Sequence, residues 1–192
     1  MASFDSNSLL ARTGWLSLCP DWFKRAVIEN AAEIRHSPGQ RVQHSPDGEP
    51  IGIWGLAEGV LSVGLDHLDR PDAVMHLAFP ASWGGATEVI LGRGKLTPLT
   101  ARTNVTILVL SAAKFRELAK DDPEAWRWLA LLPAINVSTA ISIIDDLLIR
   151  SARRRVASTL MRLSGHRQGF LPTLPRDVHL SQEELADAVN LS

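Results

Sequence analysis

Residues 34–111 alternate short apolar runs with turn-forming residues, and this pattern limits what the chain can fold into. Ser, Pro, Asp and Gly cluster at residues 37–39, 45–48 and 92–94, where turns are expected. Alternation with a period of two is typical of strands that bury one face. No ten-residue helical pattern interrupts the runs, which argues against a parallel sheet, because parallel strands need crossover connections. We therefore predict a small antiparallel barrel or jelly roll, with its clearest strands at residues 51–54, 60–65, 74–79, 99–101 and 105–110.

The pattern is helical on both sides of this barrel. Before it, residues 8–33 carry apolar side chains at helical spacing, and Pro20 is placed to start a second helix. After it, the spacing predicts a short helix over 112–120 and a long helix over 123–164. Pro133 lies inside the long helix and is expected to kink or restart it. The fold class is therefore α+β, an antiparallel jelly-roll followed by one long helix.

The long helix carries an apolar seam. Large apolar residues recur at the alternating four-three spacing of a coiled coil, at positions Val137, Ile141, Ile144 and Leu148. Three further residues widen this face, namely Ala140, Ile143 and Leu147. A face this apolar must be buried, either on the chain's own barrel or on a second copy. We predict that it is a homodimer seam.

Four arginines in six residues mark the end of the seam, at Arg150, Arg153, Arg154 and Arg155. Such a run is usually a solvated face. The alternatives are contact with phosphate or with the acidic first turn of the terminal motif.

The last part of the chain has the pattern of a separate, small unit. Residues 165–175 form a linker by composition, because Gly and Pro break the periodicity there. In the terminal stretch, Ser181 is a good N-cap and Glu184 completes a capping box. An apolar stripe follows, formed by Leu185, Ala188 and Val189. This is the pattern of the first helix and turn of a helix-turn-helix, whose second helix would enter the major groove of DNA.

Charge and cysteine content exclude several classes of protein. The net charge is −1, so no general basic field indicates nucleic acid binding. The single cysteine, Cys19, excludes an internal disulfide framework and a four-thiolate zinc or iron-sulfur site. The first eight residues lack the pattern of a signal peptide, and no stretch approaches the roughly 20 apolar residues of a membrane span. We expect a soluble, cytoplasmic protein without a cofactor.

Helical cap, small barrel, long apolar helix, linker and helix-turn-helix, in that order, resemble the Crp-Fnr superfamily of bacterial transcription regulators. The resemblance spans nearly the whole chain, and it is specific through the order and spacing of its fragments. The residues that carry it are 12–17, 37–39, 45–48, 103–118, 145–148, 155–157, Leu160 and 180–186.

The resemblance implies a homodimer in which the barrel senses a small effector, the long helices transmit the signal and two recognition helices read an operator. It divides the chain into a cyclic-nucleotide-binding-like sensor domain (1–122), a dimerisation helix (123–164), a linker (165–175) and an incomplete helix-turn-helix domain (176–192). The expected partners are DNA, for the full-length protein, and a second copy.

The nucleotide-binding cassette of the family is not preserved. The Gly-Glu turn that binds the ribose falls on Gly84-Gly85, and the Arg-Ser pair that binds the cyclic phosphate falls on Lys95-Leu96. Leu96 offers phosphate no hydroxyl or guanidinium. The polar pair that faces the base maps to the apolar Ala140-Ile141. A cyclic nucleotide is therefore disfavoured, and the effector stays unknown. Trp83, just before the degenerate cassette, covers a small planar effector or fills the barrel.

Other chemistries have weaker support. His67 and His76 lie on or beside predicted strands. Either could ligate a haem, but a histidine on a strand is more often a surface residue or a hydrogen-bonded core residue. Cys19 is most simply a buried small hydrophobe, with a redox-sensing role as the alternative. No histidine cluster of the metal-dependent barrel enzymes and no nucleophile-base arrangement is present, so we do not expect an enzyme.

The chain ends before the recognition helix of the expected motif, and the stripe at 185–189 is expected to lack a covering helix. Ser181, Gln182 and Ser192 are the candidate DNA-binding residues, since Ser192 would open the recognition helix in the family and the start of the previous helix can contact phosphate. The alternative is a sensor-only protein that acts through protein contact.

Overall fold

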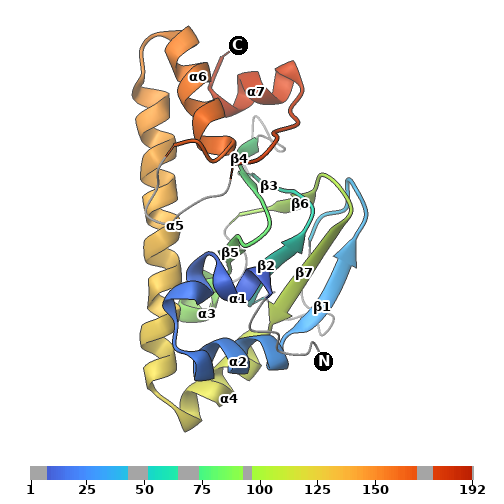
Figure 1. Cartoon of the computed structure of the whole chain (residues 1–192), viewed down its shortest axis with the longest axis vertical. Helices are drawn as coiled ribbons and strands as arrows, with labels where there is room; N and C mark the ends of the chain where they lie inside the picture. Colours follow the sequence, from blue (N-terminus) through green and yellow to red (C-terminus); the bar gives the residue numbers. More distant parts are fainter. Residues whose placement is uncertain (1–7, 43–51, 65–73, 93–96, 168–174, 192) are drawn as a thin grey trace.

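The computed structural model describes residues 8–42, 52–64, 74–92, 97–167 and 175–191 (Figure 1). In these residues, strands form two sheets with the orders β1-β7-β2-β5 and β4-β3-β6, and every pairing between strands is antiparallel. The strands are β1 (Ala32–His36), β2 (Ile53–Glu58), β3 (Leu61–Gly64), β4 (Val74–Ala78), β5 (Trp83–Gly84), β6 (Leu99–Ala101) and β7 (Val105–Leu110). The predicted antiparallel jelly-roll is confirmed.

Strand β7 is the centre of the larger sheet, which explains its nearly continuous apolar sequence. Ile107 pairs with Ile34 of β1 on one side and with Leu56 of β2 on the other. Its last four residues are all buried, because the strand is covered on both faces.

Every predicted strand overlaps a strand of the structure, whereas two strands and a helix were not predicted. The first of these strands, β1, is charged and largely exposed, so its pairing with β7 rather than its own pattern defines it. Strand β5 has only two residues, and the six-residue helix α3 (Ala86–Leu91) follows it in a stretch for which no element was predicted.

Helices at one end of the barrel close the main core. These are α1 (Leu9–Arg12), the 3₁₀ helix η1 (Trp15–Leu18), α2 (Asp21–Asn30) and α4 (Ala112–Asp121). Pro20 is the N-cap of α2, as predicted. These helices contribute three fully buried aromatic residues to the core, namely Trp15, Phe23 and Phe115. The ring of Trp15 packs edge-on against that of Phe23, with ring centroids 5.6 Å apart.

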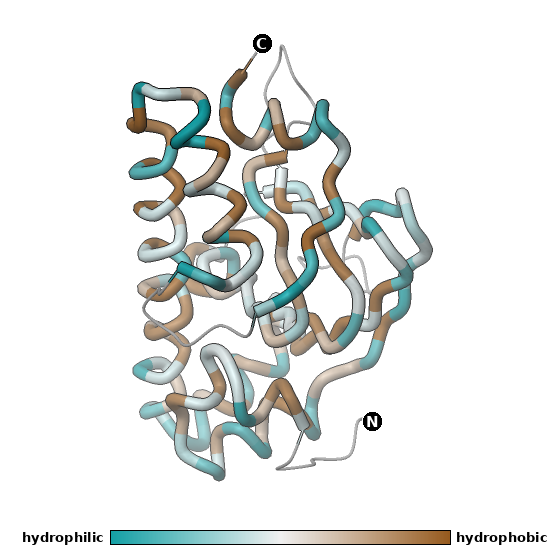
Figure 2. The backbone as a smooth tube through the Cα atoms, turned by 45° about the horizontal axis from the view of Figure 1, so that its top comes forward, coloured by the Kyte–Doolittle hydropathy of each residue, from teal (hydrophilic) through white to brown (hydrophobic). Residues whose placement is uncertain are grey.

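Helix α5 (Glu124–Leu148) runs along the whole molecule, and apolar residues recur over its full length (Figures 1 and 2). The expected single helix over 123–164 is wrong in one respect, because α5 ends at Leu148 and α6 (Ala152–Leu163) begins after Ser151. The Ser151 hydroxyl accepts from the Arg154 amide, which caps a new helix start.

Of the two expected effects of Pro133, a kink or a restart, the restart does not occur, because α5 is one helix from Glu124 to Leu148. The helix continues on both sides of it, and the preceding turn is anchored in the core, where Leu129 and Leu132 are buried. Tertiary packing therefore outweighs the cost of the proline.

Among the described helices, α5 has the length and composition of a membrane span, with 25 residues and a mean hydropathy of 1.5 over its most apolar window. The expectation that no stretch approaches such a span is wrong in this respect. However, Ala125, Leu129 and Leu132 of α5 pack into the main core, and such a helix is weak evidence for a membrane.

Helix α7 (Gln182–Ala188) begins with the predicted capping box. The Ser181 hydroxyl accepts from the Glu184 amide at 3.1 Å, and a Glu184 carboxylate oxygen accepts from the Ser181 amide at 2.8 Å. The expectation of an uncovered stripe is wrong, because Val189 is fully buried and both Leu185 and Ala188 are partly buried. Helix α7 packs on β4 of the same chain.

Candidate functional site

The positions of the nucleotide cassette are occupied by two interlocked tryptophan–glycine pairs. Strands β2 and β5 pair Trp54 with Gly84 and Gly55 with Trp83. A Cβ on Gly84 would lie 2.5 Å from the Trp54 ring, and a Cβ on Gly55 would lie 2.7 Å from the Trp83 ring. Each indole therefore lies over a glycine of the opposite strand.

Gly85 is fixed by backbone conformation as well as by space. Its φ is +87°, and a Cβ there would lie 1.8 Å from the Gly52 carbonyl oxygen. The glycines at the cassette position therefore serve packing. Trp83 itself is buried, with its ring edge-on to Trp15 at 5.4 Å. Its indole Nε1 has no hydrogen-bond partner among the described residues.

The structure places only some of the predicted ligand residues. Lys95 and Leu96 lie outside the described residues, while Ala140 and Ile141 are exposed on α5. Of the two interpretations of Trp83, the arrangement favours the one in which it fills the barrel, since its ring is enclosed by Trp15 and by Gly55 of β2.

Helix α5 has two apolar faces rather than one. On its inner face, Ala125, Leu129 and Leu132 pack into the main core, and Ile143, which was expected to widen the seam, is buried as well. The predicted seam is exposed to solvent in the single chain, with exposed fractions of 56% for Val137, 60% for Ile141, 55% for Ile144 and 75% for Leu148. This outer stripe, the name used below for these four residues, is thus not packed on the chain's own barrel.

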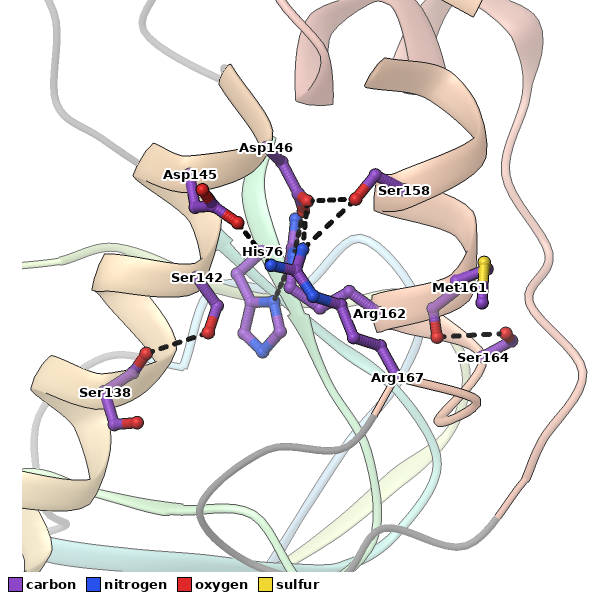
Figure 3. A network of polar contacts seen from close by, with 10 residues as sticks. All are labelled: His76, Ser138, Ser142, Asp145, Asp146, Ser158, Met161, Arg162, Ser164 and Arg167. Atoms are coloured by element: carbon purple, nitrogen blue, oxygen red, sulfur yellow. Dashed lines mark hydrogen bonds and ion pairs between the residues drawn. The ribbon is translucent and has the colours of Figure 1, made fainter. Parts of the chain in front are cut away.

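A polar network joins the C-terminal end of α5 to α6 (Figure 3). The carboxylate of Asp146, 1% exposed, accepts from Arg162 Nε at 2.6 Å and from the Ser158 hydroxyl at 2.6 Å, both on α6. Arg167, beyond α6, bridges Asp146 to the exposed Asp145. Arg162 also contacts Nδ1 of His76 on β4 at 3.2 Å. The network therefore ties α5, α6 and strand β4 together.

Charge and burial set the protonation states in this network. Burial, followed by the charges of Arg162 and Arg176, lowers the pKa of His76 from 6.5 to about 3, so His76 is neutral at physiological pH. Burial alone would raise the pKa of Asp146, but hydrogen bonds from Arg162 and Ser158 and the charges of Arg162 and Arg167 hold it below 3.8. Asp146 is therefore an anion and His76 an acceptor for the guanidinium.

These contacts argue against a haem role for His76, because its Nδ1 accepts from Arg162 inside the network and the residue is surrounded by cations. His67 lies outside the described residues. The described residues also contain no group of three or more His, Cys, Asp or Glu side chains that could hold a metal ion.

Cys19 is 5% exposed, and burial raises the pKa of its thiol to about 12, with a smaller opposing effect of Lys24. The interpretation of Cys19 as a buried hydrophobe therefore fits the structure, because the reactive thiolate form is strongly disfavoured.

Two arginines bind the terminal helix, and sequence analysis missed one of them. Arg155 donates from Nε to the Val189 carbonyl at 2.7 Å and from Nη1 to the Ile149 carbonyl at 2.8 Å. The acidic first turn of α7 pairs instead with Arg102 of the β6–β7 connection, through Glu184. Ser181 and Gln182 are exposed, and Ser192 lies outside the described residues.

The network was also missed, since Asp145 and Asp146 attracted notice only through the family resemblance. A signal was present in the sequence: Asp146 lies three residues after Ile143 on a helix, so it shares the face that Ile143 buries. A carboxylate on a buried face requires cationic partners.

No family model and no curated protein matches the sequence. Among solved structures, the chain is similar to the c-di-GMP-responsive global regulator CLP of Xanthomonas campestris, with a TM-score of 0.67, 16% identity and coverage of 90% of this chain and 86% of that one. The chain has the Crp-Fnr sensor fold.

Two further solved structures share this fold. A protein assigned to the crp/fnr family of transcriptional regulators from Eubacterium rectale has a TM-score of 0.59 and 15% identity, covering 76% of this chain and 68% of that one. A protein assigned as a cAMP-binding regulatory protein from Silicibacter pomeroyi has a TM-score of 0.60 and 15% identity, covering 96% and 80%. At these identities the likeness establishes the Crp-Fnr sensor fold and no particular ligand.

Proposed function

We propose that this chain is a transcription regulator of the Crp-Fnr type: a cytoplasmic, effector-responsive homodimer that binds DNA through the helix-turn-helix beginning at Ser181, and not an enzyme. The observation that carries the proposal is the outer stripe of α5. Its four large apolar side chains recur at coiled-coil spacing, and each is more than half exposed. Exposing this apolar surface to water is unfavourable, which favours pairing with a second copy.

The effector in this proposal is not a cyclic nucleotide. Gly84 and Gly85 lie against Trp54 and the Gly52 carbonyl, and Trp83 is buried among barrel residues. Isothermal titration with cyclic AMP and cyclic GMP should therefore give no binding heat. Micromolar binding of either would contradict this part of the proposal.

Dimerisation is tested by Ile144→Asp in analytical ultracentrifugation. A charge in the seam should give a monomer, because both copies would bury an unpaired carboxylate. The matched control is Leu91→Asp on α3, since both side chains are 55% exposed and large. The control should remain a dimer, and an unchanged dimer for Ile144→Asp would place the interface elsewhere.

DNA reading is tested by operator selection with the protein purified from the cell that makes it. Recovery of a pseudo-palindromic sequence would support the regulator, because two-fold symmetry of the protein is mirrored in its operator.

A second candidate is a sensor-only protein that acts through protein contact. The docking of α7 on β4 and the burial of Val189 favour it, because this helix is held by the chain's own sensor. Failure to select any DNA sequence, together with an intact dimer, would support this candidate.

A further inference from the structure

Positive charge is concentrated in one segment of the chain. Residues 147–176 contain seven arginines and no Asp or Glu, so the remaining residues carry a net charge of −8 against a total of −1. The near-neutral total therefore conceals a strongly basic segment, of the kind that contacts polyanions.

Four of these arginines have structural partners. Arg155 donates to the carbonyls of Ile149 and Val189, and Arg162 and Arg167 bind Asp146. The guanidinium of Arg176 lies over the ring of Phe79 at 4.5 Å. These four contribute to the fold itself.

The other three, Arg150, Arg153 and Arg154, are exposed and have no ion-pair partner in the part of the chain that the structure describes. They are called the arginine patch below. Arg153 and Arg154 also lie in the first turn of α6, which contains no acidic residue. Cations are unfavourable there, because the N-terminal end of a helix carries partial positive charge. Folding thus places these positive charges close together without a counter-charge. An external anion would supply that counter-charge.

The position of the arginine patch suggests what that anion is. It begins two residues after Leu148, the last residue of the outer stripe, and lies at the same end of the molecule as α7 (Figure 1). In the parallel dimer that the proposed function requires, joined through the stripe, the patches of both copies come to the same end, beside the two-fold axis. Planar guanidinium groups suit phosphate, and duplex DNA presents phosphates on both sides of such an axis.

We infer that Arg150, Arg153 and Arg154 form a contact surface for the phosphate backbone of duplex DNA. This rests on the proposed function. It adds to that function a sequence-independent contact made outside the helix-turn-helix.

The test measures anisotropy of a labelled random-sequence duplex of about 30 base pairs with the 192-residue chain, between about 50 mM and about 200 mM salt. Replacing all three patch arginines by Gln should weaken binding at least about tenfold at the lowest salt, and should reduce the slope of log affinity against log salt by about 0.9 for each lost contact. Replacing them by Lys should retain most of the slope, because the charges remain.

The matched control replaces Arg12 on α1 and Arg116 and Lys120 on α4 by Gln, which removes the same charge from exposed positions on helices that lie away from α6 (Figure 1). Its slope should be unchanged. An equal loss in this control, an unchanged Gln variant, or no duplex binding by the parent chain would each overturn the inference. Binding to phosphatidylserine vesicles in place of the duplex would overturn it too, in favour of a membrane surface.

Sedimentation of the same samples separates the two proposals. If the chain is a dimer but its arginine patch does not affect duplex binding, only the patch is wrong. If Gln variants lose duplex binding while the parent chain is a monomer, the patch stands and the dimeric regulator is wrong.

Discussion

Asp146→Asn should be among the most destabilising single substitutions at the α5–α6 junction. The change keeps the shape of the side chain but removes its charge, which leaves Arg162, 9% exposed, without its counter-ion. Removing one partner of a buried ion pair typically costs about 3–5 kcal/mol. For a chain of this length that corresponds to a fall in melting temperature of roughly 6–20 °C.

Asp145→Asn is the control, because it removes one negative charge from the neighbouring residue, whose carboxylate also pairs with Arg167. The side chain of Asp145 is 63% exposed, so the loss should not exceed about 1 kcal/mol. Urea unfolding followed by circular dichroism at pH 7 and at one protomer concentration gives both values. This pH is suitable, because the folded protein holds the pKa of Asp146 below its ordinary value of 3.8. The stabilisation by this carboxylate is present above pH 3.8 and is lost as pH falls through the lower, folded pKa.

A double variant tests the physical reason. If the loss comes from an uncompensated guanidinium, Arg162→Met added to Asp146→Asn should restore part of the stability. Equal losses for Asp145→Asn and Asp146→Asn would refute the reasoning, since burial would then make no difference.

Three other predictions concern groups away from this carboxylate. The pKa of His76 is 6.5 in the unfolded chain and about 3 in the folded protein, so between these values the unfolded state binds one more proton. The free energy of unfolding should therefore fall as pH drops from about 6.5 toward 3, by up to about 1.4 kcal/mol per pH unit. In urea titrations, His76→Gln should flatten this dependence on pH. A native protein whose curve matches that of His76→Gln would contradict the assignment. Cys19, with its thiol pKa raised to about 12, should react with a thiol reagent only after unfolding, and rapid labelling of the native protein would show that it is accessible. Gly84→Ala should cost about 1–3 kcal/mol in urea unfolding, because its Cβ would meet the Trp54 ring, and an unchanged midpoint would mean that the ring moves freely.

Local signals in the sequence were sufficient for much of the fold. The apolar run that produces β7 and the capping box at Ser181 depend on residues close in sequence, and both were predicted. The break between α5 and α6 also has a local signal, the N-cap Ser151, but it contains neither Gly nor Pro and an apolar helical pattern continues across it.

The features that were missed depend on distant residues. Strand β1 is defined by its pairing with β7, which sequence periodicity does not contain. The partners of Asp146 come from residues 12 to 21 positions away, and the contact of Arg162 with His76 spans 86 positions. The glycines of the cassette were identified as a departure from the family, but only the opposing strand shows that tryptophan rings occupy their space.

The two apolar faces of α5 fix an angular relation between the sensor and the proposed partner. An α-helix turns by about 100° and rises about 1.5 Å per residue. The number of residues from Leu132, on the inner face, to Val137, on the outer stripe, therefore sets the direction in which a second copy is met. A single inserted residue between them would leave both surfaces chemically intact and yet rotate one against the other, so the symmetry of a dimer built on this helix is encoded in residue count as much as in residue type.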